Sequence, residues 1–272
     1  MADKVVLVVG GGGREHALCM ELKQSKHVGE LHCAPGNAGT SYLAKNHSIS
    51  ATDVEGLLEL AKTLNADLVV VGPEAPLCAE LADRLSEDEI PCFGPIGILA
   101  HLEGSKLHAK QVMQDANVPT AAFHVLSKSS DIEAALDDFA GNPWVVKRDV
   151  LAGGKGVVVT SQRNEARSFI EQSIHTDGQV LLEDFLPGEE ASMLVIMDGS
   201  GYVCLPASQD HKRAFDGDEG PNTGGMGAYC PAPVVTDAVR QKTIETIIEP
   251  MHKYLIASGT PYRGVLYVGL MI

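Results

Sequence analysis

Apolar residues in the first hundred positions alternate between short aliphatic runs and stretches with helical spacing. The runs predict strands at 5–9, 30–34 and 68–71, and the helical spacing predicts helices at 15–24, 54–64 and 78–85. Aliphatic strands separated by helices are typical of a parallel sheet that is covered on both faces. The pattern therefore predicts an α/β, Rossmann-like parallel-sheet domain at the N-terminus.

The hydrophobic pattern changes after residue 103. A predicted helix at 104–117 carries Lys106 and Lys110 and ends at Val118-Pro119. Beyond it, the predicted strands are 121–126, 144–147, 156–160, 179–184, 191–197, 202–206 and 263–272, and the predicted helices are 130–140, 164–173 and 236–256. Strands in such quick succession, with few helices between them, indicate an α+β region.

Composition narrows the class of protein. The chain has 272 residues, a formal net charge of −15 and no apolar run of about 18 residues, so we expect no membrane-spanning segment. An acidic protein repels nucleic acid and anionic lipid, and we expect neither as a partner. The six cysteines show no CxxC spacing, which favours reduced thiols and a cytoplasmic location.

The first candidate site is the turn in KVVLVVGGGGREHAL, residues 4–18. A dinucleotide fingerprint needs a third glycine, but that position holds Glu15 or His16, depending on the register. Residues 33–37, at the end of the second strand, contain no carboxylate that could bind a ribose. The turn is thus predicted to bind a phosphate other than that of NAD, the alternative being a tight turn without a ligand.

A second glycine-rich loop lies in VVKRDVLAGGKGVVV, residues 145–159. One predicted strand ends near Lys147, and Lys155 lies in the loop before the next strand. The sequence is not a Walker loop, because GxxxxGK[ST] is absent and no helix follows. Lysines beside exposed backbone amides instead suggest a flap over a triphosphate, and the alternative is a hairpin with a surface lysine.

Two further stretches suggest ligand contacts. In residues 180–192, the segment from Glu183 to Leu186 offers backbone groups and an apolar wall suited to a purine ring, and Glu190 could accept hydrogen bonds from ribose hydroxyls. Residues 207–233 form a long loop rich in charge and glycine, as a small anionic or zwitterionic substrate would require. A solvated glutamate and a surface loop are the alternatives.

Together these stretches resemble the ATP-grasp superfamily and, within it, the phosphoribosylamine–glycine ligase family. The motifs that carry the resemblance are GGGREHAL at 11–18, APGNAGT at 34–40, VVGPEAPL at 70–77, FGP at 93–95, LEGSK at 102–106, LAGGKGV at 151–157, GEEAS at 188–192, QDHKR at 209–213 and GPNTGGMGAYCPAP at 220–233. They occur in the family's order and cover nearly the whole chain.

The resemblance implies an N-terminal Rossmann-like domain at 1–103, a connecting helix at 104–120, an ATP-lid subdomain at 121–187 and an ATP-grasp core at 188–272. It also implies a reaction in which ATP, glycine and 5-phosphoribosylamine give glycinamide ribonucleotide, ADP and phosphate through a glycyl phosphate. The family's ligands for Mg²⁺ or Mn²⁺ lie beyond residue 272. We therefore expect a core incomplete at its C-terminus, no metal ligand in this chain, and little or no activity of the chain alone.

The resemblance also implies roles for individual residues. Expected to contact ATP are Lys106 and Lys147 at the phosphates, Gly153, Gly154, Lys155 and Gly156 in the flap that closes over them, Glu183, Phe185 and Leu186 around adenine, and Glu190 at the ribose. Expected to contact glycine or the ribosylamine are Gly11, Gly12, Gly13, Asn37, Glu74, Asp210, Lys212, Thr223, Gly224, Gly225 and Met226, with Asn37 and Glu74 on the face that the first domain shares with the core. Lys147, Asp210 and Lys212 are the expected catalytic residues.

The chain departs from the family at Arg148 and Val150, where a small residue and a glycine are usual. A β-branched valine does not adopt the positive φ of glycine cheaply, so these positions bear on the path of the flap. Two other functions stay open: a different ATP-grasp carboxylate–amine ligase, and a nucleotide-binding domain without catalytic activity.

Overall fold

The computed structural model describes residues 3–151, 156–211, 213–217, 219–223 and 227–272. The chain forms two compact units, which are described separately below. Unit 1 comprises Met1–His101 with Tyr262–Gly264, and unit 2 comprises Leu102–Pro261 with Val265–Ile272.

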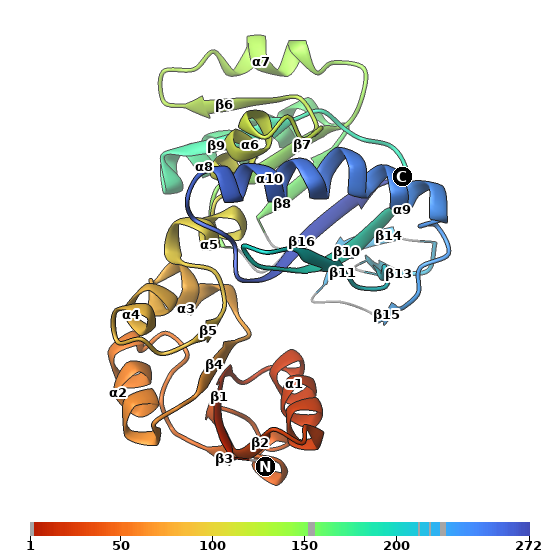
Figure 1. Cartoon of the computed structure of the whole chain (residues 1–272). Coiled ribbons are helices and arrows are strands. Elements are labelled where there is room, and N and C mark those ends of the chain that lie inside the picture. The colour runs from red at the N-terminus through yellow and green to blue at the C-terminus, as the bar shows by residue number, and fades with distance from the viewer. Residues whose placement is uncertain (1–2, 152–155, 212, 218, 224–226) are drawn as a thin grey trace. The chain divides into compact units, whose positions relative to one another are not determined.

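Unit 1 contains one parallel sheet of five strands in the order β3-β2-β1-β4-β5 (Figure 1). Its strands are β1 (Lys4–Gly10), β2 (Val28–Pro35), β3 (Lys45–Asn46), β4 (Leu68–Val71) and β5 (Cys92–Phe93). Its helical segments are α1 (Gly13–Gln24), η1 (Thr40–Tyr42), α2 (Val54–Leu64), α3 (Glu74–Cys78) and α4 (Leu81–Glu87). The predicted Rossmann-like parallel sheet is confirmed.

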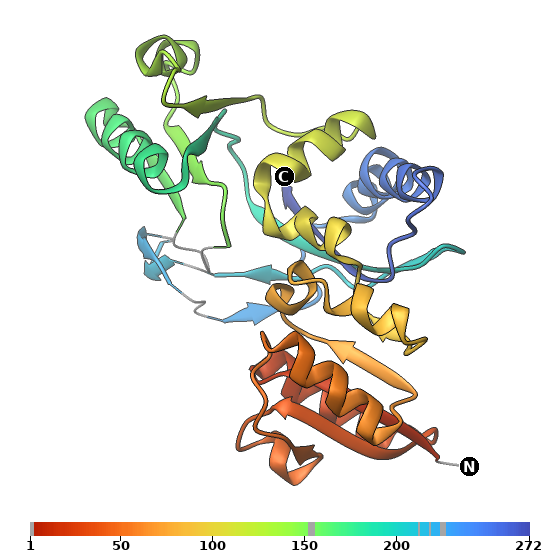
Figure 2. The same cartoon turned by 90° about the vertical axis from the view of Figure 1, so that its left-hand side faces the viewer.

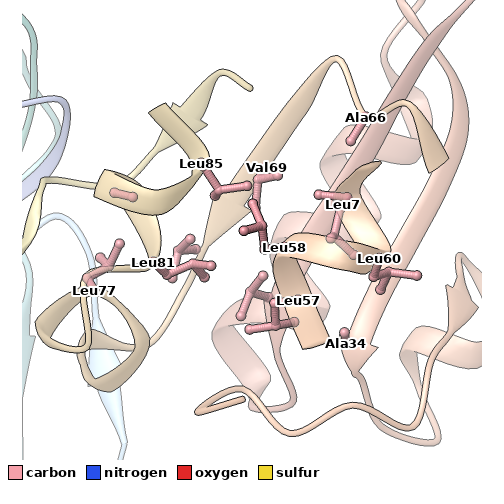
Figure 3. Packing of buried hydrophobic residues seen from close by; sticks show 14 of the residues in the cluster. Leu7, Ala34, Leu57, Leu58, Leu60, Ala66, Val69, Leu77, Leu81 and Leu85 are labelled. Carbon is pink, nitrogen blue, oxygen red and sulfur yellow. The ribbon is translucent and has the colours of Figure 1, made fainter. Parts of the chain in front are cut away.

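The central strand β1 is buried on both faces because its apolar residues alternate between two cores. Leu7 and Val9 belong to a cluster with leucines of α2 and α4, which Figure 3 shows around Leu57, Leu81 and Leu85. Val6 and Val8 point to the other face and pack with Cys19, Leu31 and Cys33. The continuous apolar run therefore codes for a strand that helices cover on both sides.

Unit 2 contains an antiparallel sheet in the order β6-β9-β7-β8. Its strands are β6 (Phe123–Ser127), β7 (Trp144–Arg148), β8 (Val157–Thr160) and β9 (Gln179–Glu183), accompanied by helices α7 (Ile132–Asp138) and α8 (Arg163–Asp177). Leu136 and Ile170 from the helices pack on Val146, Val180 and Leu182 from the sheet. We refer to this sheet as the lid sheet, after the ATP-lid subdomain that the resemblance predicts at residues 121–187.

The remainder of unit 2 is built on a second sheet, in the order β11-β10-β16. Its strands are β10 (Glu190–Met197), β11 (Tyr202–Cys204) and β16 (Gly264–Met271). Two short ladders pair β12 (Gln209–Asp210) with β15 (Ala228–Tyr229) and β13 (Arg213–Phe215) with β14 (Glu219–Asn222). Figure 2 shows α9 (Asp237–Thr243), η2 (Ile244–Ile248) and α10 (Glu249–Ala257) as one helical run. These elements agree with the predicted α+β region.

Two predicted helices are divided in the structure. The region 104–117 contains the end of α5 (Gly97–Gly104) and all of α6 (Lys106–Asp115), because Ser105 adopts an extended conformation and caps α6 through the amide of His108. The helix predicted at 78–85 is separated into α3 and α4 by Glu80, whose φ of 65° is left-handed. Local capping and backbone geometry, rather than apolar spacing, set these boundaries.

Candidate functional site

The glycine turn after β1 encloses the side chain of Glu15. The residue is 3% exposed, and its carboxylate accepts hydrogen bonds from the Gly12 amide (2.6 Å) and from Arg14 Nε (3.0 Å). A Cβ at Gly10 or at Gly72 would lie 2.6 Å from Cγ of Glu15. Glycine is thus needed at these positions because the backbone closes tightly around the side chain of Glu15.

This packing explains in physical terms why the turn does not suit a dinucleotide. Glu15 stands where the fingerprint requires its third glycine in one of the two registers, and its carboxylate already accepts the amide of the N-cap residue of α1. A negative charge held at that helix terminus competes with a pyrophosphate for the same donor.

The predicted substrate residues of unit 1 lie together at the carboxyl edge of the sheet. Asn37 Nδ2 donates to the backbone carbonyls of Gly11 (3.0 Å) and Gly12 (3.3 Å), and Arg14 Nη1 reaches Glu74 at 3.2 Å. Gly11, Gly12 and Gly13 are exposed. The chain turns from β1 toward β2 and later returns to β4 on the other side of β1, so this edge is a topological switch point, where α/β proteins bind ligands.

In unit 2, Lys147, which is predicted to contact the phosphates of ATP, belongs to a buried cluster of charged side chains. Its Nζ donates to Oε2 of Glu183 (2.9 Å), and Lys110 Nζ lies 3.1 Å from the same oxygen. The Glu183 side chain is 3% exposed, Lys110 7% and Lys147 30%. Two cations from α6 and β7 thus share one buried carboxylate from β9. We refer to Lys110, Lys147 and Glu183 as the charge cluster.

Lys106 lies near this cluster at the start of α6. Its Nζ donates to the carbonyl oxygen of Val150 (3.2 Å). Burial lowers the pKa of Lys106, the Asp149 carboxylate opposes that shift, and the positive charge of Lys147 adds to it. The tertiary structure therefore brings together the two lysines that the sequence predicts for ATP phosphates, in a chain of net charge −15.

Asp149 connects the root of the glycine-rich loop to the start of α6. Its carboxylate accepts hydrogen bonds from Ser105 Oγ (3.0 Å), the Leu107 amide (3.0 Å) and Gln179 Nε2 (2.8 Å). It therefore supplies an anion to the N-terminus of α6, where the helix dipole favours one. The same contacts fix the Val150 carbonyl next to Lys106.

Replacing Asp149 with alanine is expected to lower the free energy of unfolding by about 1–2 kcal/mol, because an N-terminal amide loses its charged acceptor. Hydrogen exchange at the Leu107 amide should become faster. Asp115→Ala, at the exposed far end of the same helix, is the control and should leave that exchange rate unchanged. Equal exchange at Leu107 in Asp149→Ala and in the unmodified chain would contradict the assignment.

The unusual Arg148 has a structural explanation. Its guanidinium donates twice to Asp177 at the end of α8 (2.6 and 2.8 Å), and its amide donates to the carbonyl of the buried Gly156 (2.8 Å). The hydrogen bond from Arg148 lowers the pKa of Asp177. Arg148 thus links the end of β7, just before the glycine-rich loop, to the end of α8. Nothing in the structure explains Val150.

The predicted adenine and ribose residues follow the lid sheet. Phe185 is partly buried, Leu186 is 43% exposed and Glu190 is exposed at the start of β10. The side chain of Glu183 is directed at the two lysines of the charge cluster. Contact of these four residues with adenine and ribose stays a prediction.

The predicted substrate residues of unit 2 are described only in part. Asp210 is partly buried and pairs with Ala228 in the ladder of β12 and β15, where the hydroxyl of Tyr229 also contacts Gln209. Thr223 is partly buried. The other predicted residues, Gly153, Gly154, Lys155, Lys212, Gly224, Gly225 and Met226, lie outside the described residues. The catalytic roles proposed for Lys147, Asp210 and Lys212 stay predictions.

Three residues near these sites were not among the predicted site residues. Lys110 and Asp149 become recognisable only when α6, β7 and β9 are in place, because their partners are distant in the sequence. Arg14 stands within GGGREHAL, and its position just after the glycines was the one signal that could have identified it. The LEGSK motif includes Lys106, but Lys110 lies one helical turn beyond the motif and was therefore not predicted as a site residue.

The described ranges show no sign of two other kinds of site. They hold no group of three or more His, Cys, Asp or Glu side chains that could bind a metal ion. None of their helices is long and apolar enough to cross a membrane. The six cysteines all lie within these ranges, and none of them forms a disulfide bond.

Comparison with known families gives two matches that together cover the chain from residue 4 onward. Residues 4–103 match the model of the N domain of phosphoribosylglycinamide synthetase, and residues 104–272 match the model of its ATP-grasp (A) domain.

Individual proteins agree with these matches. Phosphoribosylamine–glycine ligase of Streptomyces coelicolor is 48% identical over 267 residues, which cover 98% of this chain and 63% of that protein. The crystal structure of phosphoribosylamine–glycine ligase from Thermotoga maritima superposes with a TM-score of 0.80 at 34% identity, over 98% of this chain and 65% of that one. The chain thus spans slightly less than two thirds of the length of these relatives.

A more distant structure shares the fold alone. N5-carboxyaminoimidazole synthetase from Staphylococcus aureus, complexed with ADP, has a TM-score of 0.72 at 18% identity and covers all of this chain and 68% of that one.

Proposed function

This chain belongs to the phosphoribosylglycinamide synthetase family, and from that premise we propose that it takes part in the ATP-dependent ligation of glycine to 5-phosphoribosylamine. The products are glycinamide ribonucleotide, ADP and phosphate, as in purine biosynthesis. The N-domain match and the 48% identity favour this reaction over that of another ATP-grasp ligase.

The chemistry requires that the carboxylate of glycine be activated. A carboxylate and an amine do not condense in water at neutral pH, because the carboxylate oxygen is a poor leaving group. In the proposed reaction, a glycine oxygen attacks the γ-phosphorus of ATP and ADP departs. The amine nitrogen then attacks the carbonyl carbon of the glycyl phosphate, phosphate leaves, and the nitrogen loses a proton. The protein's task is to position the anions and to neutralise their charge.

The observation that carries this proposal is the gathering of three lysines beside the lid sheet. Lys106 and Lys147 are the groups proposed to neutralise ATP phosphates, while the Gly153–Gly156 loop is proposed to cover them and residues 183–190 to hold adenine and ribose. The molecule has 36 acidic and 21 basic side chains, so a local cluster of lysines is unusual and indicates an anionic ligand. A polyphosphate is the partner that fits both this charge and the family.

Family members are expected to use Mg²⁺ or Mn²⁺ with ATP. The carboxylates near the lysines, Asp149 and Glu183, are already engaged by cations or hydrogen-bond donors, and the described residues hold no group of three or more His, Cys, Asp or Glu side chains that could bind a metal ion. These residues do not fit such a site, so no step of the reaction is assigned to a metal here. Cysteines that form no disulfide bond are compatible with the reducing cytosol that we propose as the location.

Calorimetry with the non-hydrolysable analogue AMP-PNP tests nucleotide binding by this chain, with and without magnesium. We expect saturable binding with one site, and competition by ADP but not by NADH. Heat from NADH together with none from AMP-PNP would refute the proposal. A coupled assay for ADP that includes glycine and 5-phosphoribosylamine tests the complete reaction.

We also propose that the glycine turn of unit 1 contacts the phosphoribosyl group, together with Asn37, Glu74 and Arg14. Ribose 5-phosphate should shift the amide resonances of Gly11–Gly13, and Arg14→Met should weaken its binding about 5- to 30-fold through loss of a charged donor. Free ribose is the control and should cause no such shifts. Shifts confined to other parts of the chain would show that the phosphoribosyl group binds elsewhere.

A further inference from the structure

The two lysines that share Glu183 differ in how many of their N–H donors already have an acceptor inside the protein. Lys110 Nζ also donates to Thr120 Oγ1 (2.8 Å) and lies 3.1 Å from the carbonyl oxygen of Ala121, so its three N–H groups all have acceptors. It also lies 5.3 Å from the centre of the Phe123 ring. Lys110 is therefore held inside the protein and has no donor left for an external ligand.

Lys147 is in a different position. Its side chain is 30% exposed, and its ammonium group has three donors, one of which is used by Glu183 at 2.9 Å. It can therefore turn toward a phosphate oxygen. Such a move would leave the buried Glu183 carboxylate without a counter-charge if no second cation were present, and a buried unpaired ion is strongly destabilising.

We propose that Lys110 is a positioning residue that holds the charge of Glu183, so that Lys147 can exchange from Glu183 to a nucleotide phosphate. This inference rests on the proposed function, because it presupposes that a nucleotide binds at Lys147. It assigns to Lys110 no contact with ATP and no part in the chemical steps.

The positive charges that face Glu183 in the described part of the chain lie on two neighbouring elements, α6 and β7. Lys110 and Lys106 lie on α6 and Lys147 on β7, while β6 places the apolar Phe123 opposite Glu183 in the sheet register. Burial lowers the pKa of Lys110, and the Glu183 carboxylate opposes that shift. Removing the charge of Lys110 would leave Lys147 as the remaining ion-pair partner of Glu183 at this site.

The test is calorimetry of AMP-PNP binding at pH 8 in buffers with different ionisation enthalpies, which measures proton uptake. Lys110→Met should bind the analogue about 10-fold or more weakly, because Lys147 can leave Glu183 only if Glu183 becomes protonated. Binding to this variant should therefore take up as much as one proton more than binding to the unmodified chain. A variant with merely loosened packing would show no additional uptake.

Glu183→Gln provides the matched comparison. With the carboxylate removed, Lys110→Met should change affinity by less than about twofold and cause no proton uptake, a comparison that stands even if Lys110→Met alone does not fold. A large loss in Lys110→Met/Glu183→Gln relative to Glu183→Gln would overturn the proposal, as would unchanged affinity and proton uptake in Lys110→Met. Absence of AMP-PNP binding to the unmodified chain would instead refute the proposed function itself.

Discussion

Replacing Lys147 with methionine is expected to weaken AMP-PNP binding by roughly 10- to 100-fold, the largest effect on binding among the changes considered. A hydrogen bond from a charged donor to a phosphate is worth about 1.5–3 kcal/mol. Methionine keeps the length and the apolar stem of the side chain but removes the charge. Calorimetry in the same buffer measures the change directly.

The charge cluster explains why the Lys147→Met variant should still fold. Glu183 keeps Lys110 as its partner when Lys147 is replaced, so the variant should fold and its loss should be one of binding. Lys128→Met, at an exposed position just after β6, removes the same charge next to the same sheet and is the control. If Lys128→Met weakened binding as much as Lys147→Met, general electrostatics would explain the loss.

Replacing Gly72 with alanine is expected to lower the free energy of unfolding of unit 1 by about 2–4 kcal/mol. The new Cβ would overlap the buried Glu15 side chain, which has little room to move because Gly12 and Arg14 hold its carboxylate. The Gly72 amide donates to Val9 (3.0 Å), so the strain would also reach the junction of β1 and β4. Hydrogen exchange of the β1 and β4 amides measures the loss.

Gly13→Ala is the matched control, because a Cβ at Gly13 would meet no atom of the described residues within 4 Å. It should change the stability of unit 1 by less than about 0.5 kcal/mol. The fluorescence of Trp144, the single tryptophan of the chain, reports on the lid sheet in unit 2. Similar exchange rates in the two glycine variants would show that Glu15 can move aside, and the tight packing inferred for the turn would be wrong.

Much of the fold could be predicted because buried strands and helices leave a recognisable pattern of apolar residues in the sequence. The run at β1 is apolar at every position from Val5 to Val9, and the structure buries Leu7 and Val9 on one face and Val6 and Val8 on the other. Helix boundaries were harder to predict. The break at Ser105 depends on a capping hydrogen bond, and that between α3 and α4 depends on one left-handed residue, neither of which alters apolar spacing.

Some features of the candidate site could likewise be predicted from the sequence, and others could not. The sequence by itself determined the parallel sheet and the failure of the dinucleotide fingerprint, and its motifs predicted Lys106 and Lys147 as phosphate-binding residues, because each of these follows from a local motif or from the pattern of apolar residues. Only the tertiary structure decided that Lys110 shares Glu183 with Lys147 and that Asp149 holds the start of α6. The physical reason is that an ion pair depends on distance and burial, and both are set by the packing of elements that are far apart along the chain.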